Sequence, residues 1–104
     1  MTALFVVRAV VPAADRATFD AWYRREHLPD AMRAFGVAKA WRAWSRTDAS
    51  VHTAFYEFDS VEAAEAATAP ERLKALVAEF DRVWGSRMTR SRDLLEVVER
   101  QGGP

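Results

Sequence analysis

Consecutive apolar residues mark the start of the chain as a strand. From Ala3 to Val11 the residues are apolar and rich in valine, and only Arg8 interrupts the run. A strand with one face in water alternates apolar and polar residues, whereas this run is apolar on both faces. The pattern therefore predicts a strand that is covered on both sides. It should end at Pro12, which has no backbone N–H to offer a sheet.

The next segment has the periodicity of a helix. Asp15 is a candidate N-cap, and four ring-bearing side chains then recur at helical spacing, namely Phe19, Trp22, Tyr23 and His27. Pro29 disfavours helical geometry in the residue before it and suits the first turn of a new helix, so we expect a break or kink over residues 27–29. The short helix that follows should run through Phe35 and stop at Gly36.

Two more strands are predicted between residues 37 and 58. Residues 37–47 form the first of them, with Trp41 and Trp44 on opposite faces because side chains alternate along a strand. Residues 47–50 have the composition of a turn, and residues 51–58 form the next strand. The two strands therefore form a hairpin.

The second half of the chain contains two helix starts and a final strand. Residues 59–62 have the pattern of a capping box that opens a short alanine-rich helix, and residues 68–71 hold a second start signal. The helix after it has the most regular apolar stripe in the chain: Leu73, Leu76, Val77, Phe80, Val83 and Trp84. We expect this helix to end at Gly85 and residues 88–99 to form a fourth strand.

The predicted order is strand, helix, strand, strand, helix, strand. This is the ferredoxin-like βαββαβ arrangement, an α+β fold whose four-stranded antiparallel sheet carries its helices on one face. We expect residues 1–100 to form a single domain and residues 101–104 a loose tail. A second copy of the sheet is the simplest cover for the face without helices, which predicts a homodimeric α/β barrel. A monomer with scattered exposed apolar residues is the alternative.

The composition argues against several classes of binding partner and against several kinds of binding site. The 15 basic residues balance the 15 acidic ones, so no net charge attracts nucleic acid or an anionic membrane. The sequence has no cysteine, which excludes disulfides and thiolate metal sites and is compatible with a cytoplasmic protein. We find no ligand set with metal-binding spacing, no glycine-rich phosphate loop and no nucleophile elbow, and therefore expect neither metal nor cofactor.

His27 is the strongest candidate for chemistry. It lies four residues after Tyr23, which places both rings on one helix face, while Glu26 points elsewhere. A neutral histidine takes or gives a proton near pH 7, so His27 is a candidate acid/base with Tyr23 beside it. The alternative is that His27 caps the C-terminus of its helix, where its cation would meet the helix dipole.

Tyr56 and His52 form a second candidate group on the third strand. They share one face of that strand with Ala54 between them. We expect the small Ala54 to leave room for a ligand and Tyr56 to polarise a carbonyl or hold a phenol, with His52 assisting or simply lying near the turn. Core packing is the alternative for Tyr56.

Four tryptophans are many for 104 residues. An apolar pocket for a flat ligand would use some of them, and Trp22, Trp41 and Trp84 are the candidates. Core or dimer packing is the simpler role for any single one, above all for Trp84, which lies on the apolar stripe.

Arginines in the predicted strands are a last group: Arg8, Arg42, Arg90 and Arg92. We expect them to pair across the sheet with acids such as Glu57, Asp93 and Glu96. The alternative is that one of them binds a substrate carboxylate.

The segment from Phe19 to Pro29 carries a family resemblance. Its residues follow the pattern F-x-x-W-Y-x-x-E-H-x-P, and Phe-Gly-Val follows at 35–37. Together with residues 52–60 and 84–85, this segment resembles the EthD-like branch of the dimeric α/β-barrel superfamily, over nearly the whole chain.

The resemblance implies a pocket between sheet and helices, with His27 near its mouth. Members of the superfamily include cofactor-free monooxygenases, lactone isomerases, polyketide cyclases and haem-degrading oxygenases, so the fold does not fix the reaction. The first hypothesis is a cofactor-free enzyme, a cyclase, isomerase or monooxygenase, that acts on a small aromatic or ketonic substrate with His27 as acid/base. The second is a homodimer that binds a small apolar or aromatic ligand without turnover.

An RNA-binding domain is a third and more remote hypothesis, because such domains share the βαββαβ order. Ala54, Phe55 and Phe58 match part of their third-strand pattern, and Phe5 would be the partner aromatic. Residues 51–53 miss the basic, glycine and aromatic positions of that pattern, and the zero net charge argues against RNA as well.

Overall fold

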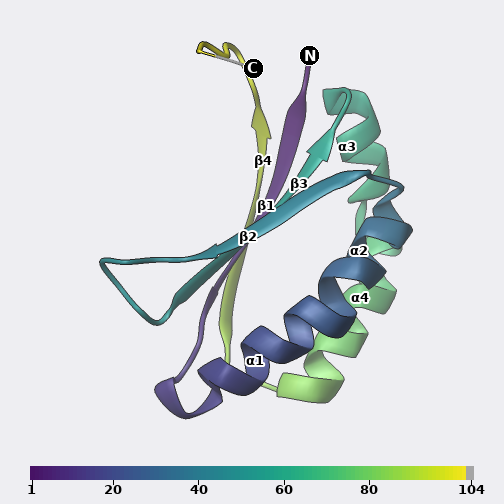
Figure 1. Cartoon of the computed structure of the whole chain (residues 1–104). Coiled ribbons are helices and arrows are strands. Elements are labelled where there is room, and N and C mark those ends of the chain that lie inside the picture. Colours follow the sequence, from purple (N-terminus) through teal and green to yellow (C-terminus); the bar gives the residue numbers. More distant parts are fainter. Residues whose placement is uncertain (103–104) are drawn as a thin grey trace.

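The computed structural model describes residues 1–102 as one sheet with helices along one side (Figure 1). Its elements in chain order are β1 (Ala3–Val10), the 3-10 helix η1 (Ala13–Asp15), α1 (Arg16–Trp22), the π-helix η2 (Tyr23–His27), α2 (Leu28–Phe35), β2 (Lys39–Trp44), β3 (Val51–Phe58), α3 (Val61–Ala67), α4 (Pro70–Trp84) and β4 (Thr89–Glu96). The expected βαββαβ order is confirmed. Of the tail expected over 101–104, residues 103 and 104 lie outside the described residues.

The four strands pair antiparallel in the order β2-β3-β1-β4. β1 is hydrogen-bonded on both sides, so that Ala3 is paired with Phe58 of β3 and with Glu96 of β4. The edge strands β2 and β4 are shorter than the sequence predicts, and most of their residues are exposed or half-buried. A central strand is shielded by its neighbours, which explains why β1 and β3 have the more apolar sequences.

Alternation along the strands divides the sheet into two faces. The face under the helices forms the core with the rings that the helices place on it, and its large buried members are Phe5, Tyr56, Phe58, Phe19, Trp22, Tyr23, Phe35, Phe80 and Trp84. Phe19 is at the centre, with its ring 5.1 Å from that of His52 and 5.4 Å from those of Tyr23 and Trp84. The core is thus a cluster of aromatic rings, a group that buries much apolar area per residue.

The opposite side of the sheet, called the open face below, has no helix on it (Figure 1). Trp41 is 42% exposed there and stacks on Phe55 with the ring centroids 5.6 Å apart. Val10 and Leu95 on the same face are exposed to the same extent. Trp44 lies on the helix-covered face, so the expected separation of the two tryptophans is confirmed.

The expected break over residues 27–29 is wrong, because the backbone stays helical from Arg16 to Phe35. The irregularity lies one turn earlier, in the π-helix η2, whose wider turn shifts the hydrogen-bond register by one residue. Such a shift lets the helix pass Pro29, which lacks an N–H, without ending.

Of the predicted helix ends, the cap at Asp15 is wrong, whereas the cap of α3 and the stop at Gly36 are confirmed. Asp15 forms no side-chain cap, because its own backbone is helical, and its carboxylate lies 3.5 Å from Arg87. Ser60 does cap α3, with its hydroxyl oxygen accepting from the Ala63 N–H at 3.0 Å. Gly36 ends α2 with a φ of 69°, in the left-handed region that glycine adopts without strain.

The RNA-binding alternative loses two of its three aromatic residues. Phe5 and Phe58 are 5% and 4% exposed and lie in the core under the helices, so neither is available to stack on a base. The third, Phe55, lies on the open face, where its ring stacks on that of Trp41.

Within residues 1–102, no helix combines the length and the apolar character that crossing a bilayer requires.

Candidate functional site

The π-helix brings His27 against two aromatic rings. The imidazole stacks on the indole of Trp22 with centroids 4.7 Å apart, and it meets the edge of the Tyr23 ring at 4.9 Å. Glu26 is exposed, as the helical spacing predicts. The predicted contact between Tyr23 and His27 is therefore confirmed, in a turn wider than an α-helical one.

His27 is held as a neutral imidazole. It is 8% exposed, and its Nδ1 is buried without a hydrogen-bond partner within residues 1–102. Burial lowers the pKa of His27 to about 4, and the acids Asp30 and Glu79 only partly oppose this effect. The alternative of a C-terminal helix cap is wrong, because α2 continues to Phe35 and the environment favours the uncharged ring.

His27 lines a pocket between the helices and the sheet, called the central pocket below. The side chains around it come from β1, η2, α2, β3, α4 and β4, and they are Phe5, Val7, His27, Ala31, Phe35, Tyr56, Leu73, Leu76, Val77, Phe80, Arg90 and Arg92. Its inner void is about 40 Å³, which is room for water but not for an aromatic ring. A substrate-sized ligand therefore requires the walls to move apart.

The first half of α4 forms a half-buried wall of the pocket. Leu73, Leu76 and Val77 face the pocket and are only half-buried, whereas Phe80 and Trp84 further along the same helix are buried in the aromatic core. Side chains with few packed neighbours shift at low cost, because little contact energy is lost. The apolar stripe of α4 thus serves as core at one end and as pocket wall at the other.

Tyr56 is the second polar group in the central pocket. Its hydroxyl lies 3.4 Å from the hydroxyl of Tyr23, so the two phenols share one hydrogen bond in the core. Burial raises the pKa of Tyr23 to about 12 and also raises the pKa of Tyr56. Both are therefore neutral phenols, and one of the two O–H groups is free to donate to a third partner.

The space expected beside Ala54 is occupied. Ala54 is fully buried and does not line the pocket. The ring of Tyr23 lies 4.6 Å from that of His52, and its hydroxyl reaches Tyr56, so Tyr23 contacts both side chains that flank Ala54 on the strand. The expectation of room for a ligand at Ala54 is wrong because a helix side chain fills it.

His52 belongs to a different polar cluster. Its Nε2 accepts from an Arg42 N–H at 3.4 Å, and the same guanidinium donates to Asp20 at 2.6 Å. Trp44 also donates to Asp20, at 2.8 Å, and these two side-chain hydrogen bonds lower the pKa of Asp20. Burial and the adjacent Arg42 charge lower the pKa of His52 to about 4. This cluster fastens α1 to β2 and β3, and none of its members lines the central pocket.

The three candidate tryptophans occupy three different places. Trp22 backs the His27 ring, Trp84 packs against Phe19 and Trp22 in the core, and Trp41 lies on the open face of the sheet. None of them lines the central pocket. They are placed to support the site or to cover the sheet, and direct ligand contact by any of them stays a prediction.

Two of the four strand arginines pair with helix acids, and within residues 1–102 none of the four pairs across the sheet. Arg42 binds Asp20, and Arg90 binds Asp81 of α4 at 2.8 Å. The expected cross-strand pairs are wrong because alternation turns Arg42, Arg90 and Arg92 toward the helices, while Glu57 is taken by Lys39 and Arg100. The sequence analysis did not identify Arg90 and Arg92 as pocket residues. Their spacing of two was a signal that both lie on one face of the strand, and in the structure they lie opposite Ala9 and Val7 of β1.

Within residues 1–102, no group of histidine and carboxylate side chains is arranged to hold a metal ion. What the central pocket brings together is a neutral imidazole, a neutral phenol and two guanidinium groups on an otherwise apolar wall. Such a set can hydrogen-bond a carbonyl or phenol and exchange a proton with it.

The two buried histidines make stability depend on pH. In an unfolded chain their pKa is about 6.5, and in the folded protein it is about 4. Between these values the unfolded state binds more protons than the folded state, so the free energy of unfolding falls as pH falls. We expect each histidine to reduce it by about 2 kcal/mol on going from pH 7 to pH 5. Urea denaturation at the two pH values measures this loss.

The matched control is the double variant His27→Gln/His52→Gln. Glutamine does not titrate, so the variant should lose little stability between pH 7 and pH 5, whatever its stability at pH 7. An equal pH slope in wild type and double variant would show that other groups cause it.

The π-turn makes a prediction about chain length. Deleting the exposed Arg25 should convert η2 into an α-turn and leave the helix after it in nearly the same orientation relative to α1, because the wider turn already accommodates the extra residue. His27 should therefore keep its stack on Trp22, and the ring-current shift of its imidazole protons should remain in the NMR spectrum. Arg25→Ala removes the same side chain at constant length and should also keep that shift. Loss of the shift in the deletion variant alone would show that the extra residue is needed to place His27.

Several solved structures have the same architecture as this chain. No protein-family model and no curated protein sequence matches the chain. An EthD (ethyl tert-butyl ether D) family protein from Bacillus halodurans superimposes with a TM-score of 0.70 at 17% identity, covering 94% of this chain and 100% of that one. A structure described as an antibiotic biosynthesis monooxygenase from Bordetella bronchiseptica gives 0.74 at 16% identity, covering 94% and 98%.

A third similar structure is SnoaB, a cofactor-independent oxygenase from Streptomyces nogalater. It superimposes with a TM-score of 0.62 at 18% identity and covers 95% of each chain. Identities this low establish a shared architecture and leave the reaction open. The chain therefore has the ferredoxin-like fold that these solved structures share.

Proposed function

We propose that this protein is a cofactor-free enzyme that transfers a proton to or from a small aromatic or ketonic substrate in the central pocket. His27 is the acid/base in this proposal, Tyr56 orients the substrate, and Tyr23 positions Tyr56. Isomerisation, cyclisation and oxygenation of an activated aromatic ring all begin with such a proton transfer.

The observation that carries the proposal is the unpartnered Nδ1 of a buried, neutral histidine on the pocket wall. His52 Nδ1 and Trp84 Nε1 are also buried without a partner within residues 1–102, but neither residue lines the central pocket. A buried polar atom without a partner is costly, and natural proteins keep very few of them. A ligand group or an enclosed water that bonds this imidazole would remove that cost. The likeness to a cofactor-independent oxygenase agrees with chemistry that needs no bound group.

The proton transfer can be written for phenylacetone. The imidazole of His27 takes a proton from the methylene carbon next to the carbonyl, the C–H electron pair forms the C=C bond, and the carbonyl π pair moves to oxygen, which gives an enolate. The phenol of Tyr56 donates to the carbonyl oxygen, provided that Tyr23 donates to Tyr56 in their shared hydrogen bond. The imidazolium then returns its proton to carbon, to oxygen or to solvent. An apolar enclosure favours these steps because it strengthens the hydrogen bond to the developing negative charge.

Deuterium exchange tests this function on a neutral probe. Phenylacetone in D₂O should exchange its methylene protons faster with the protein than in buffer, and NMR follows the loss of their signal. Oxygen uptake with a dihydroxynaphthalene tests the oxygenase form of the same chemistry. If both compounds bind and neither reaction exceeds the buffer rate, the protein is not this enzyme.

A ligand-binding protein without turnover is the second candidate. The small void and the lowered pKa of His27 favour it, because a weakly basic, tightly packed imidazole suits a hydrogen bond better than it suits proton abstraction. Saturable binding of phenylacetone without exchange is the result that would assign this function.

We also propose that the working form is a homodimer joined through the open face. Trp41, Val10 and Leu95 are each 42% exposed there, and no element within residues 1–102 covers them. A second copy in a two-fold arrangement would place identical apolar surfaces against each other.

A further inference from the structure

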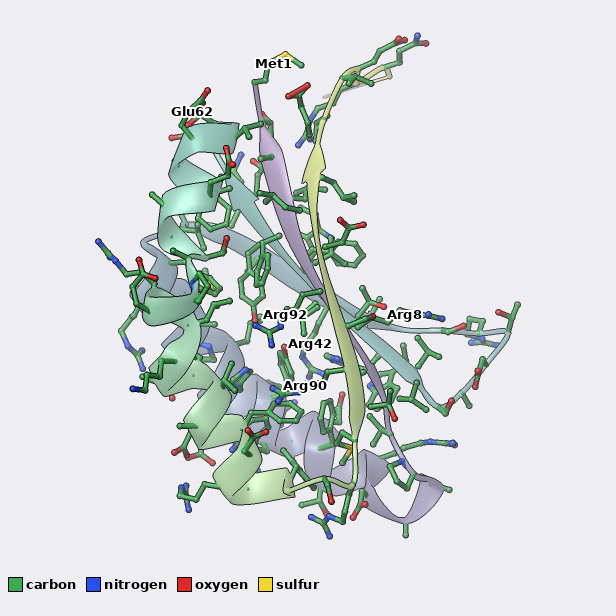
Figure 2. All side chains as sticks on the ribbon, turned by 180° about the vertical axis from the view of Figure 1, so that it is seen from behind. Met1, Arg8, Arg42, Glu62, Arg90 and Arg92 are labelled. Atoms are coloured by element: carbon green, nitrogen blue, oxygen red, sulfur yellow. The ribbon has the colours of Figure 1, made fainter. Side chains whose placement is uncertain are left out.

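Three arginines point from the sheet into the layer beneath the helices. Arg42 comes from β2, and Arg90 and Arg92 come from β4, whereas Arg8 lies on the other side of the sheet (Figure 2). Arg90 and Arg92 are two residues apart, so alternation puts both on the helix-facing side and both line the central pocket.

Only two of these three guanidinium groups have an acidic partner. Arg42 is paired with Asp20 at 2.6 Å, and Arg90 with Asp81 at 2.8 Å. Arg90 is further fixed by its guanidinium lying 3.9 Å from the centroid of the Phe80 ring. Within residues 1–102, no carboxylate lies within ion-pair distance of Arg92.

The surroundings of Arg92 do not neutralise it either. No aspartate or glutamate lines the central pocket, and the one histidine that does is uncharged. Arg92 also lines a second hollow along α4, which shares Leu73 and Val77 with the central pocket, and it is itself exposed. The acid in that hollow, Asp81, is already paired with Arg90. Arg92 therefore lies at the mouth of the central pocket, where a ligand can reach it from solvent.

We propose that Arg92 selects ligands that carry a carboxylate. The aromatic part of such a ligand enters the apolar interior beside Phe80 and Phe35, and its carboxylate stays at the mouth on the guanidinium of Arg92. This inference rests on the proposed function, because it assumes that the central pocket binds the substrate. It adds a chemical class, aromatic acids, which the neutral imidazole and phenol do not specify.

A planar carboxylate fits this position better than a phosphate. One guanidinium offers two parallel N–H groups, which match the two oxygens of a carboxylate. Arg90 is already committed to Asp81 and Phe80, and no glycine-rich loop supplies backbone N–H groups nearby. A dianionic phosphate would therefore keep one charge uncompensated.

Binding of 2-naphthoate and its neutral analogue 2-naphthamide tests the inference. Calorimetry at low salt should give a dissociation constant about tenfold smaller for naphthoate, as expected for a single charge-assisted contact. Arg92→Gln should remove this preference and leave naphthamide binding unchanged. Arg8→Gln removes the same charge from the opposite side of the sheet and should keep the preference.

The other outcomes of these binding measurements would each contradict a different claim: the role of Arg92, the preference for a carboxylate, or the pocket itself. Equal affinities of the two compounds for wild type, or a preference that survives Arg92→Gln, would overturn the inference about Arg92 and leave the proposed function standing. A naphthyl phosphate that binds more tightly than naphthoate would overturn the assignment of a carboxylate. Absence of binding by both naphthoate and naphthamide would overturn the pocket, and with it both proposals.

Discussion

His27→Gln is expected to reduce the rate of deuterium exchange into phenylacetone by about 10²- to 10⁴-fold, the usual contribution of a positioned general acid/base. Glutamine keeps a hydrogen-bonding group of similar reach but cannot hold the transferred proton. Binding of the ketone should persist, because the apolar wall supplied by Phe5, Phe35 and Phe80 is unchanged. The effect should therefore appear in kcat and leave KM nearly constant.

His52→Gln provides the matched comparison. His52 is also buried and its pKa is also lowered to about 4, but it does not line the central pocket. The substitution breaks its contact with Arg42, so we expect a loss of stability and only a severalfold loss of exchange rate at about the same ketone affinity. Similar losses of exchange from the two variants would mean that fold integrity, and not a proton carried by His27, controls turnover.

The pH dependence adds a third discriminator. A base whose pKa is about 4 is fully deprotonated at neutral pH, so exchange by wild type should be constant from pH 6 to pH 8. It should decline only as the pH falls toward 4. A profile that follows a pKa near 6.5 would point to an exposed histidine and contradict the buried site.

Trp41→Glu is expected to convert a dimer into a monomer. Wild type should sediment with twice the chain mass of 11.7 kDa, and the variant with that mass itself. Burial of an indole contributes about 1.5–3 kcal/mol, and a carboxylate buried against apolar residues costs several more, so one change per subunit alters the interface twice. Because Trp41 is 42% exposed in the single chain and outside the core, the variant should still fold.

Ala66→Glu controls for the added charge. Ala66 is exposed on α3, on the helix-covered side of the sheet, and glutamate is well tolerated in a helix. This variant should remain dimeric. A wild-type protein that sediments as a monomer at micromolar concentration would refute the dimer, whatever the variants do.

Much of the fold could be predicted from apolar periodicity, because the apolar residues of each element line the one or two faces by which it packs against its neighbours. The run at β1 indicated a strand, and the stripe from Leu73 to Trp84 indicated a helix packed on the sheet. That β1 is covered on both sides stays a prediction, because within residues 1–102 no helix lies on the open face. The capping serine at position 60 and the glycine at position 36 were predictable because their geometry is local. Asp15 failed as a cap because a 3-10 turn, invisible in the pattern, already gives it a helical backbone.

The site was harder to predict because it depends on contacts between elements. The spacing of Tyr23 and His27 correctly indicated that their rings touch, but not that Tyr23 fills the space at Ala54. The strand arginines were assigned partners on neighbouring strands, whereas their acids, Asp20 and Asp81, come from helices that pack across them. Periodicity gives the face on which a residue lies and does not give what lies opposite.

The wide turn at η2 means that one residue between Tyr23 and His27 can be lost with little effect on where the imidazole lies. Loss of a single codon between positions 23 and 26 would turn η2 into an α-turn and leave the histidine on nearly the same helix face. A distant relative that lacks the extra residue would thus carry its histidine one position earlier and still share the site. Ranking such relatives by letters matched without a gap would overlook them.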